Sequence, residues 1–214
     1  MTDRQAESDP QDLKTPVPGD VISPSLEQPP LKIRRAAAAV LRSVWTTGLL
    51  LAQRRIHQPR EHLGETLHFA DGTSAPVYRE TMVQRHRTES PVVLVVEFRL
   101  RWVHGRRHAL FRAESLLNTP LFVGSSGFVS KLWLAHDQND VYRGVYEWDD
   151  PTLAHTYARA LWRVLALVSV PGSIHYVVLP GLHRDALLAN PGVTDPGGRI
   201  GEWWRLVNVE RATA

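Results

Sequence analysis

The order of strand and helix patterns between residues 91 and 180 constrains this chain more than any other feature of its sequence. Four stretches have the β-branched and aromatic content or the alternation of strands, and two repeat their apolar residues with helical spacing. In chain order they are strand 92–102, helix 106–118, strand 128–134, strand 141–148, helix 151–168 and strand 173–180. This β-α-β-β-α-β order predicts an α+β protein of the ferredoxin-like kind, a sandwich in which two helices cover one face of an antiparallel sheet.

Local signals support this order. Asp150 followed by Pro151 is typical of a helix start, because the acid caps the first turn and proline fits its first position. The polar residues 136–140 separate two strand patterns, which predicts a hairpin. The second face of such a sheet is uncovered, and a large apolar face is not left in water. We therefore expect either a second subunit or the terminal segments of the chain to cover it.

Several short motifs in this region resemble one known family. They are Gly127-Phe128, Lys131-Leu132-Trp133, the run from Tyr142 to Asp150, and Ala154 with Tyr157. These motifs are similar to those of the YdhR-type monooxygenases, which belong to the dimeric α+β barrel superfamily. The resemblance covers residues 92–180. It implies a homodimer whose sheets face one another, and a small hydrophobic or aromatic substrate that some members oxidise without a metal or flavin.

Composition limits the other possibilities. The 214 residues suit one domain with extensions, and the absence of cysteine excludes disulfides, zinc-thiolate sites and cysteine nucleophiles. Residues 1–30 carry six acidic and two basic residues, residues 31–60 carry seven basic and no acidic residues, and residues 61–214 are balanced. The main domain therefore has no basic excess with which to bind nucleic acid, and we expect no nucleic-acid partner.

The N-terminal 30 residues predict a disordered tail. They contain six prolines among acidic and polar residues, with too few apolar side chains to offset the entropy of ordering. A secretory signal needs a basic start and an apolar stretch, which this tail lacks. Together with the lack of cysteine, this favours a cytoplasmic protein, with peripheral attachment to the membrane as an open alternative.

Residues 31–60 predict a basic amphipathic helix. A membrane span is disfavoured because the longest uncharged run, 43–53, has 11 residues where ~20 are needed, and Arg42 interrupts the apolar stretch. Two interpretations remain open. The helix lies on an anionic membrane or on a partner, since arginines flank a Trp-Leu cluster, or it packs its apolar stripe on the core of the protein itself.

The segments on either side of the main domain also have defined patterns. Residues 61–90 predict a hairpin lead-in, because Asp71-Gly72 separates two β-prone runs. Residues 181–214 form a C-terminal extension with a helical turn at 185–188 and a strand at 202–209. We expect the two tryptophans of that strand to reach a partner subunit.

Alternation along the strands divides their side chains between the two faces of the sheet, and Leu94 and Val96 define the face beneath the helices. A pocket for a flat apolar ligand is expected on this side, with plain core packing as the alternative. Its candidate residues, with His175 as an assisting base, are Ser130, Tyr146, Trp162, Tyr176 and His175. The opposite face is expected to form the dimer interface or an ion-pair network. Its candidates are Glu97, Arg99, Lys131, Trp133, Arg143 and Glu147.

The second helix of the main domain carries a histidine that could in principle ligate haem iron. By resemblance, a haem degrader places a histidine on the second helix after a tryptophan, which points to His155 and Trp148. Against this, His155 shares a polar stripe with Thr152 and Arg159, which predicts a solvent-facing side chain. We expect no metal site and no other cofactor, since no HExxH, Walker A or GxGxxG motif is present.

Two functions follow from these patterns. The first is a cofactor-independent, monooxygenase-like enzyme acting on a small hydrophobic or aromatic compound. The alternative is a non-catalytic dimer that binds a ligand or partner and is attached to a membrane surface through residues 31–57.

Overall fold

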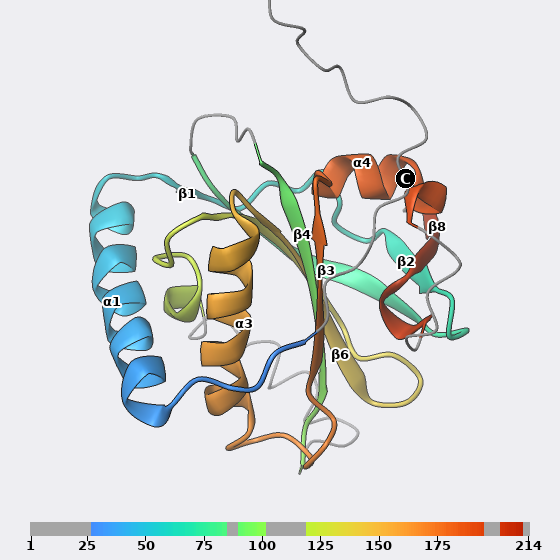
Figure 1. The fold of residues 1–214 in the computed structure, drawn as a ribbon. Helices are drawn as coiled ribbons and strands as arrows, with labels where there is room; N and C mark the ends of the chain where they lie inside the picture. Colours follow the sequence, from blue (N-terminus) through green and yellow to red (C-terminus); the bar gives the residue numbers. More distant parts are fainter. Residues whose placement is uncertain (1–26, 85–89, 102–118, 195–201, 212–214) are drawn as a thin grey trace, which may run out of the picture.

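The computed structural model describes residues 27–84, 90–101, 119–194 and 202–211 (Figure 1). Its helices and strands, in chain order, are α1 (Ile33–Ala52), β1 (Ile56–His57), β2 (Thr66–Phe69), β3 (Ser74–Val83), β4 (Val92–Arg99), β5 (Phe128–Leu134), β6 (Val141–Trp148), α3 (Pro151–Leu165), β7 (His175–Pro180), α4 (Arg184–Ala189) and β8 (Leu206–Glu210). Short 3₁₀ turns cover Pro191–Val193 and Glu202–Trp204. The protein is therefore a mixed α+β structure, as the sequence predicts.

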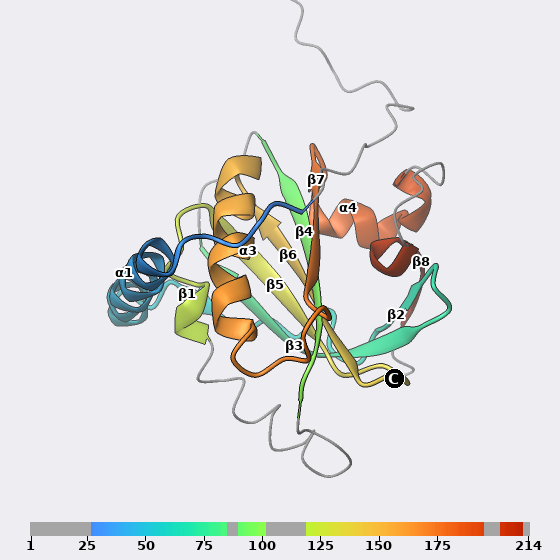
Figure 2. The ribbon, with the colours of Figure 1, turned by 60° about the horizontal axis from the view of Figure 1, so that its bottom comes forward.

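The strands of the described residues form one antiparallel sheet in the order β7-β4-β6-β5-β3-β2-β8, with β1 paired to β3. The four predicted strands of the main domain lie side by side in the spatial order fourth, first, third, second. The predicted helix at 106–118 lies outside the described residues, so the order is observed as β4, β5, β6, α3 and β7, without the first of the two predicted helices. β3 has a bulge between Val77 and Arg79, and the sheet curls toward β2 and β8 (Figure 2).

Each face of the sheet has its own apolar core. Leu94 and Val96 pack with α3 on one face, whereas Val93 and Val95 pack with α4 and β8 on the other. This alternation confirms the two faces predicted for the first strand. α3 begins as predicted, because the Asp150 carboxylate accepts a hydrogen bond from the Leu153 amide at 2.8 Å.

The face predicted to be bare is covered by the chain itself. Leu187 of α4, Trp204 and Leu206 of the C-terminal extension pack on it together with Leu67 of the β2–β3 hairpin. The predicted Asp-Gly turn is present, with Gly72 at a φ of 81°. Of the two coverings expected, the terminal segment therefore occupies this face, and the homodimer stays a prediction that must use another surface.

The C-terminal strand is shorter than predicted. Trp203 and Trp204 lie in a 3₁₀ turn, and β8 begins only at Leu206. β8 pairs with β2 of the same chain. These tryptophans were expected to reach a partner subunit, but Trp204 is buried in the core that the extension forms with the sheet.

Candidate ligand pocket

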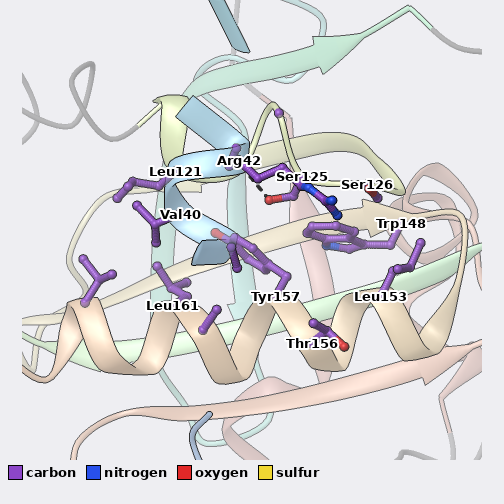
Figure 3. Close-up of a pocket in the computed structure, with 15 residues that line it drawn as sticks. Val40, Arg42, Leu121, Ser125, Ser126, Trp148, Leu153, Thr156, Tyr157 and Leu161 are labelled. Atoms are coloured by element: carbon purple, nitrogen blue, oxygen red, sulfur yellow. Dashed lines mark hydrogen bonds between the residues drawn. The ribbon is translucent and has the colours of Figure 1, made fainter. Parts of the chain in front are cut away.

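A cavity of about 180 Å³ lies between α1, α3 and the segment 121–126 (Figure 3). Apolar side chains form most of its wall, and these include Val40, Leu121, Trp148, Leu153, Leu161 and Val164. Polar groups come from Arg42, Ser125, Ser126, Thr156 and Tyr157. An apolar wall with a few hydroxyl groups is the usual composition of a small-molecule site.

Helix α1 forms one side of this pocket and is held there by two hydroxyl groups. Ser43 donates a hydrogen bond to the Pro120 carbonyl oxygen at 2.7 Å, and Thr47 reaches the same oxygen at 3.4 Å. Gly124 lies directly beneath the helix, and a Cβ atom there would collide with the backbone carbonyl of Ser43. The close approach of helix and loop therefore requires glycine at this position.

Tyr157 lines the pocket from α3 and connects it to the core. Its ring lies 5.6 Å from that of Tyr146 on β6, and the two side chains are hydrogen-bonded. Burial raises the pKa of Tyr146 and raises that of Tyr157 well above the usual range for a phenol. Both groups are therefore neutral hydroxyls at physiological pH, able to donate and accept hydrogen bonds.

Lys131 lies behind this tyrosine pair. Its Nζ is 3.3 Å from the centre of the Trp133 ring, 4.6 Å from that of Tyr146 and 4.7 Å from that of Phe122. Within the described residues, no carboxylate forms an ion pair with it. Burial, followed by the charge of Arg79, holds the pKa of Lys131 well below its usual value. The Lys131 amine, with its lowered pKa, therefore lies against Tyr146, and Tyr146 in turn contacts the pocket residue Tyr157.

Gly144 makes this arrangement possible. It pairs with Trp133 across the sheet, and a Cβ at this position would lie 2.8 Å from the Tyr146 ring and 3.3 Å from the Lys131 side chain. Because Gly144 has no side chain, the side chains of Tyr146 and Lys131 can both lie over the backbone of β6 at this point. A larger residue here would force them apart.

The position of Lys131 corrects the predicted faces of β5. Ser130 was expected beneath the helices, and Lys131 and Trp133 on the opposite side. A bulge between Phe128 and Ser130 shifts the register by one residue, so Ser130 pairs with Glu147 and Lys131 pairs with Tyr146. Because side chains alternate along a strand, this single shift exchanges the two faces. Ser130 therefore does not join Tyr146.

The other pocket candidates lie outside the cavity: Trp162 packs beside Tyr176, whereas His175 lies on the other face of the sheet, near Trp203. The ring centres of Tyr176 and Trp162 lie 6.3 Å apart, and His155 Nδ1 lies 3.2 Å from the Tyr176 hydroxyl. The segment preceding α1 closes this cluster, since the backbone N–H of Gln28 donates a hydrogen bond to the Tyr176 hydroxyl at 2.7 Å. His175 Nε2 contacts the Gly172 carbonyl at 3.0 Å. Tyr146 and Tyr176 thus share a face of the sheet, but neither of them lines the cavity.

His155 is not the solvent-facing residue that its neighbours predict. Only 9% of it is exposed, and burial, followed by the charge of Arg159, lowers its pKa. It is absent from the pocket lining, and its Nδ1 is engaged by Tyr176. Among the described residues, no three side chains of the metal-binding types are grouped to hold an ion. The cavity and His155 do not combine into a site that would fit haem.

Three of the residues predicted at the dimer face form ion pairs or hydrogen bonds within the chain. Arg143 contacts Asp71 and Asp137 at 2.8 Å and Glu97 at 3.1 Å. These contacts join the hairpin turn to the sheet. Glu147 lies 2.9 Å from His183 and accepts a hydrogen bond from the Arg184 amide at 3.2 Å, which attaches α4. Arg99 is exposed at the end of β4.

Sequence reasoning missed Tyr157 as a pocket residue. It placed Tyr157 on the second helix of the main domain, among the motif residues that carry the family resemblance, and not in the pocket. The signal that could have identified it is its place one turn from Leu153 and Leu161, since side chains at this spacing line one helix face. What lies opposite that face is α1, whose position no local pattern reveals. Comparison of the chain with protein-family models and with curated proteins finds no match.

Proposed function

We propose that the protein is a cofactor-independent, monooxygenase-like enzyme that binds a small, flat, largely apolar compound in the pocket between α1 and α3. The observation that carries this proposal is Tyr157, a hydroxyl group in an apolar cavity that is linked through Tyr146 to a buried lysine with a lowered pKa. The strand order β7-β4-β6-β5 supports a ferredoxin-like arrangement, which is the fold of the family that the sequence resembles.

The size of the cavity limits the substrate. An apolar cavity of ~150 Å³ holds one benzene ring, and the cavity here measures about 180 Å³. We therefore infer a single-ring compound in place of a polycyclic one. A phenol suits the lining, because its ring would contact Leu153 and Leu161 while its hydroxyl group meets Tyr157.

The proposed chemistry begins with loss of a proton. We propose a proton relay in which the Tyr157 oxygen accepts the proton of the phenol as Tyr157 passes its own proton to the Tyr146 oxygen. Tyr146 in turn passes its proton to the neutral Lys131 amine, which becomes an ammonium group, so both tyrosines end as neutral hydroxyls. The resulting phenolate reduces dioxygen. One oxygen atom enters the ring to give a quinone, the other leaves as water, and the apolar walls keep bulk water from the intermediate.

A labelled turnover assay tests this function. Incubation with single-ring phenols under ¹⁸O₂ is expected to give a quinone with one labelled oxygen faster than buffer does, measured by mass spectrometry. Tyr157→Phe should lower the rate by roughly 10²- to 10⁴-fold, the usual contribution of a positioned acid or base. Tyr176→Phe is the matched control, since it removes a hydroxyl from the same sheet face outside the pocket, and it should leave the rate unchanged.

Two results would contradict the proposed enzymatic function. Equal rates for the two variants would remove Tyr157 from the reaction, and absence of label from the product would exclude oxygen insertion.

A second candidate function is binding without turnover. It is favoured by the lining itself, in which Arg42 is the one charged residue among the described groups. In that case single-ring phenols raise the melting temperature of the protein while no quinone is formed. Leu161→Trp, which fills the cavity, should abolish this thermal shift.

A further inference from the structure

Helix α1 has its apolar side chains on the outside. The residues that it buries are mostly small or hydroxylated, namely Ala36, Ser43, Thr47 and Leu50. In contrast, Leu41 is 70% exposed, Trp45 74% and Leu51 59%. We call the exposed set Leu41, Val44, Trp45, Leu49 and Leu51 the outer face of α1. An ordinary surface helix turns such residues inward, so this arrangement indicates a surface that another phase or molecule covers.

The position of the helix in the fold keeps this face accessible. α1 lies outside α3, on the side away from the sheet, in both views (Figures 1 and 2). It is held by the hydrogen bonds from the buried residues Ser43 and Thr47 to Pro120, and rotation of the outer face inward would break both bonds. The apolar side chains are therefore exposed by the packing of the native structure.

Charge identifies what covers the face. Lys32, Arg34 and Arg35 precede the second turn of α1, Arg42 lies along it, and Arg54 and Arg55 follow its end. Residues 31–60 contain no acidic side chain. A second copy of the same helix would set like charges against each other. Anionic headgroups are the complementary surface, and a central tryptophan with leucines is the composition of helices that lie in a bilayer interface.

We propose that the outer face of α1 attaches the protein to an anionic lipid surface, with the helix in the plane of the interface. No helix among the described residues is long and apolar enough to cross a bilayer. The opposite side of α1 contributes Ala39, Val40 and Ser43 to the pocket. Attachment would therefore hold the pocket beside the lipid in which an apolar compound accumulates. The proposal rests on α1 alone and is independent of the pocket's chemistry.

Co-sedimentation of the full chain with vesicles tests this attachment. Vesicles of phosphatidylcholine with phosphatidylserine should retain the protein, and vesicles of phosphatidylcholine alone should not. The double variant Leu41→Ser, Trp45→Ser should lose at least tenfold in affinity. Leu167→Ser is the matched control, because Leu167 is 73% exposed outside α1 and its substitution should leave binding unchanged.

A second variant separates charge from apolar contact. Arg34→Gln with Arg35→Gln should weaken binding by about fivefold for each charge removed, which corresponds to ~1 kcal/mol each near an anionic surface. All substituted side chains are exposed, so circular dichroism should show an unchanged fold. Equal retention on both vesicle types, or wild-type binding by the Leu41, Trp45 variant, would overturn the proposal. Absence of binding to either vesicle would also overturn it and assign the face to a protein partner.

Discussion

At the scale of single residues, Lys131 is the most unusual group in the structure. A buried ammonium loses the hydration that water supplies, and three aromatic rings only partly replace it. This is why its pKa falls. The unfolded chain, in which lysine has its ordinary pKa of 10.5, binds the proton more readily than the folded protein. Lys131 therefore lowers the stability of the fold at neutral pH, and this effect disappears as the pH rises toward 10.5.

Lys131→Met should consequently stabilise the protein at pH 7. Methionine has similar length and no charge to bury, and replacement of buried charged groups by apolar ones is neutral to stabilising by roughly 1–4 kcal/mol. The gain in free energy of unfolding, measured by urea denaturation, should shrink between pH 7 and pH 10. The surface substitution Lys32→Met should change stability by less than ~0.5 kcal/mol. A loss of stability on Lys131→Met would show that the cation is favourable where it lies.

At the scale of elements, the pocket depends on how α1 meets the loop before β5. The contact uses the hydroxyls of Ser43 and Thr47 on the helix and Gly124 in the loop. α1 is therefore positioned by a few close contacts and not by burial of its largest side chains. A small change in the loop should separate the helix from the body.

Two glycine-to-alanine variants test this. Gly124→Ala should destabilise the protein by roughly 1–3 kcal/mol, because the new methyl group collides with the backbone of α1. Gly48→Ala changes α1 itself, where no atom lies within 4 Å of the new Cβ, and it should stabilise the helix by ~0.5–1 kcal/mol. Thermal unfolding measures both. If Gly124→Ala leaves the melting temperature unchanged or raises it, α1 does not lie against the loop as described.

At the scale of the whole molecule, ionic groups join the extensions to the sheet. Arg184 of α4 contacts the buried Glu80 of β3 at 2.8 Å. Nearby, His62 lies between two carboxylates: its Nε2 is 3.8 Å from Asp185 and its Nδ1 is 2.9 Å from Glu65. These two groups, Asp185 first, raise the pKa of His62 to about 9. The segment before β2 and the C-terminal extension are thus linked through one imidazolium.

This link predicts a pH dependence of stability. The folded pKa of His62 is raised above the ordinary value of 6.5, so its contribution is complete below pH 6.5 and is lost as the pH rises through about 9. His62→Gln should reduce the free energy of unfolding by roughly 1.5–3 kcal/mol at pH 6, as expected for hydrogen bonds to charged groups. Urea denaturation at pH 10, where both proteins lack the charge, should show little difference. A difference that is the same at both pH values would exclude this role for His62.

Much of the fold could be predicted because its signals are local. The strand alternation around Leu94, the cap at Asp150 and the Asp71-Gly72 turn depend on neighbours in the chain, and the structure contains all three. The candidate site could be predicted only in part. Tyr146 lies where alternation placed it, whereas Ser130 and Lys131 exchanged faces because a bulge in β5 is set by the strands on either side.

The amino-acid sequence by itself determined the strands of the main domain, the long helix after Pro151 and the basic, apolar character of residues 31–57. The tertiary structure alone decided which side of α1 faces inward and what covers the second face of the sheet. The reason is that both depend on competition between distant groups. The Pro120 carbonyl and Gly124 select the hydroxyl side of α1, and the C-terminal core around Trp204 occupies the surface that a second subunit would otherwise cover.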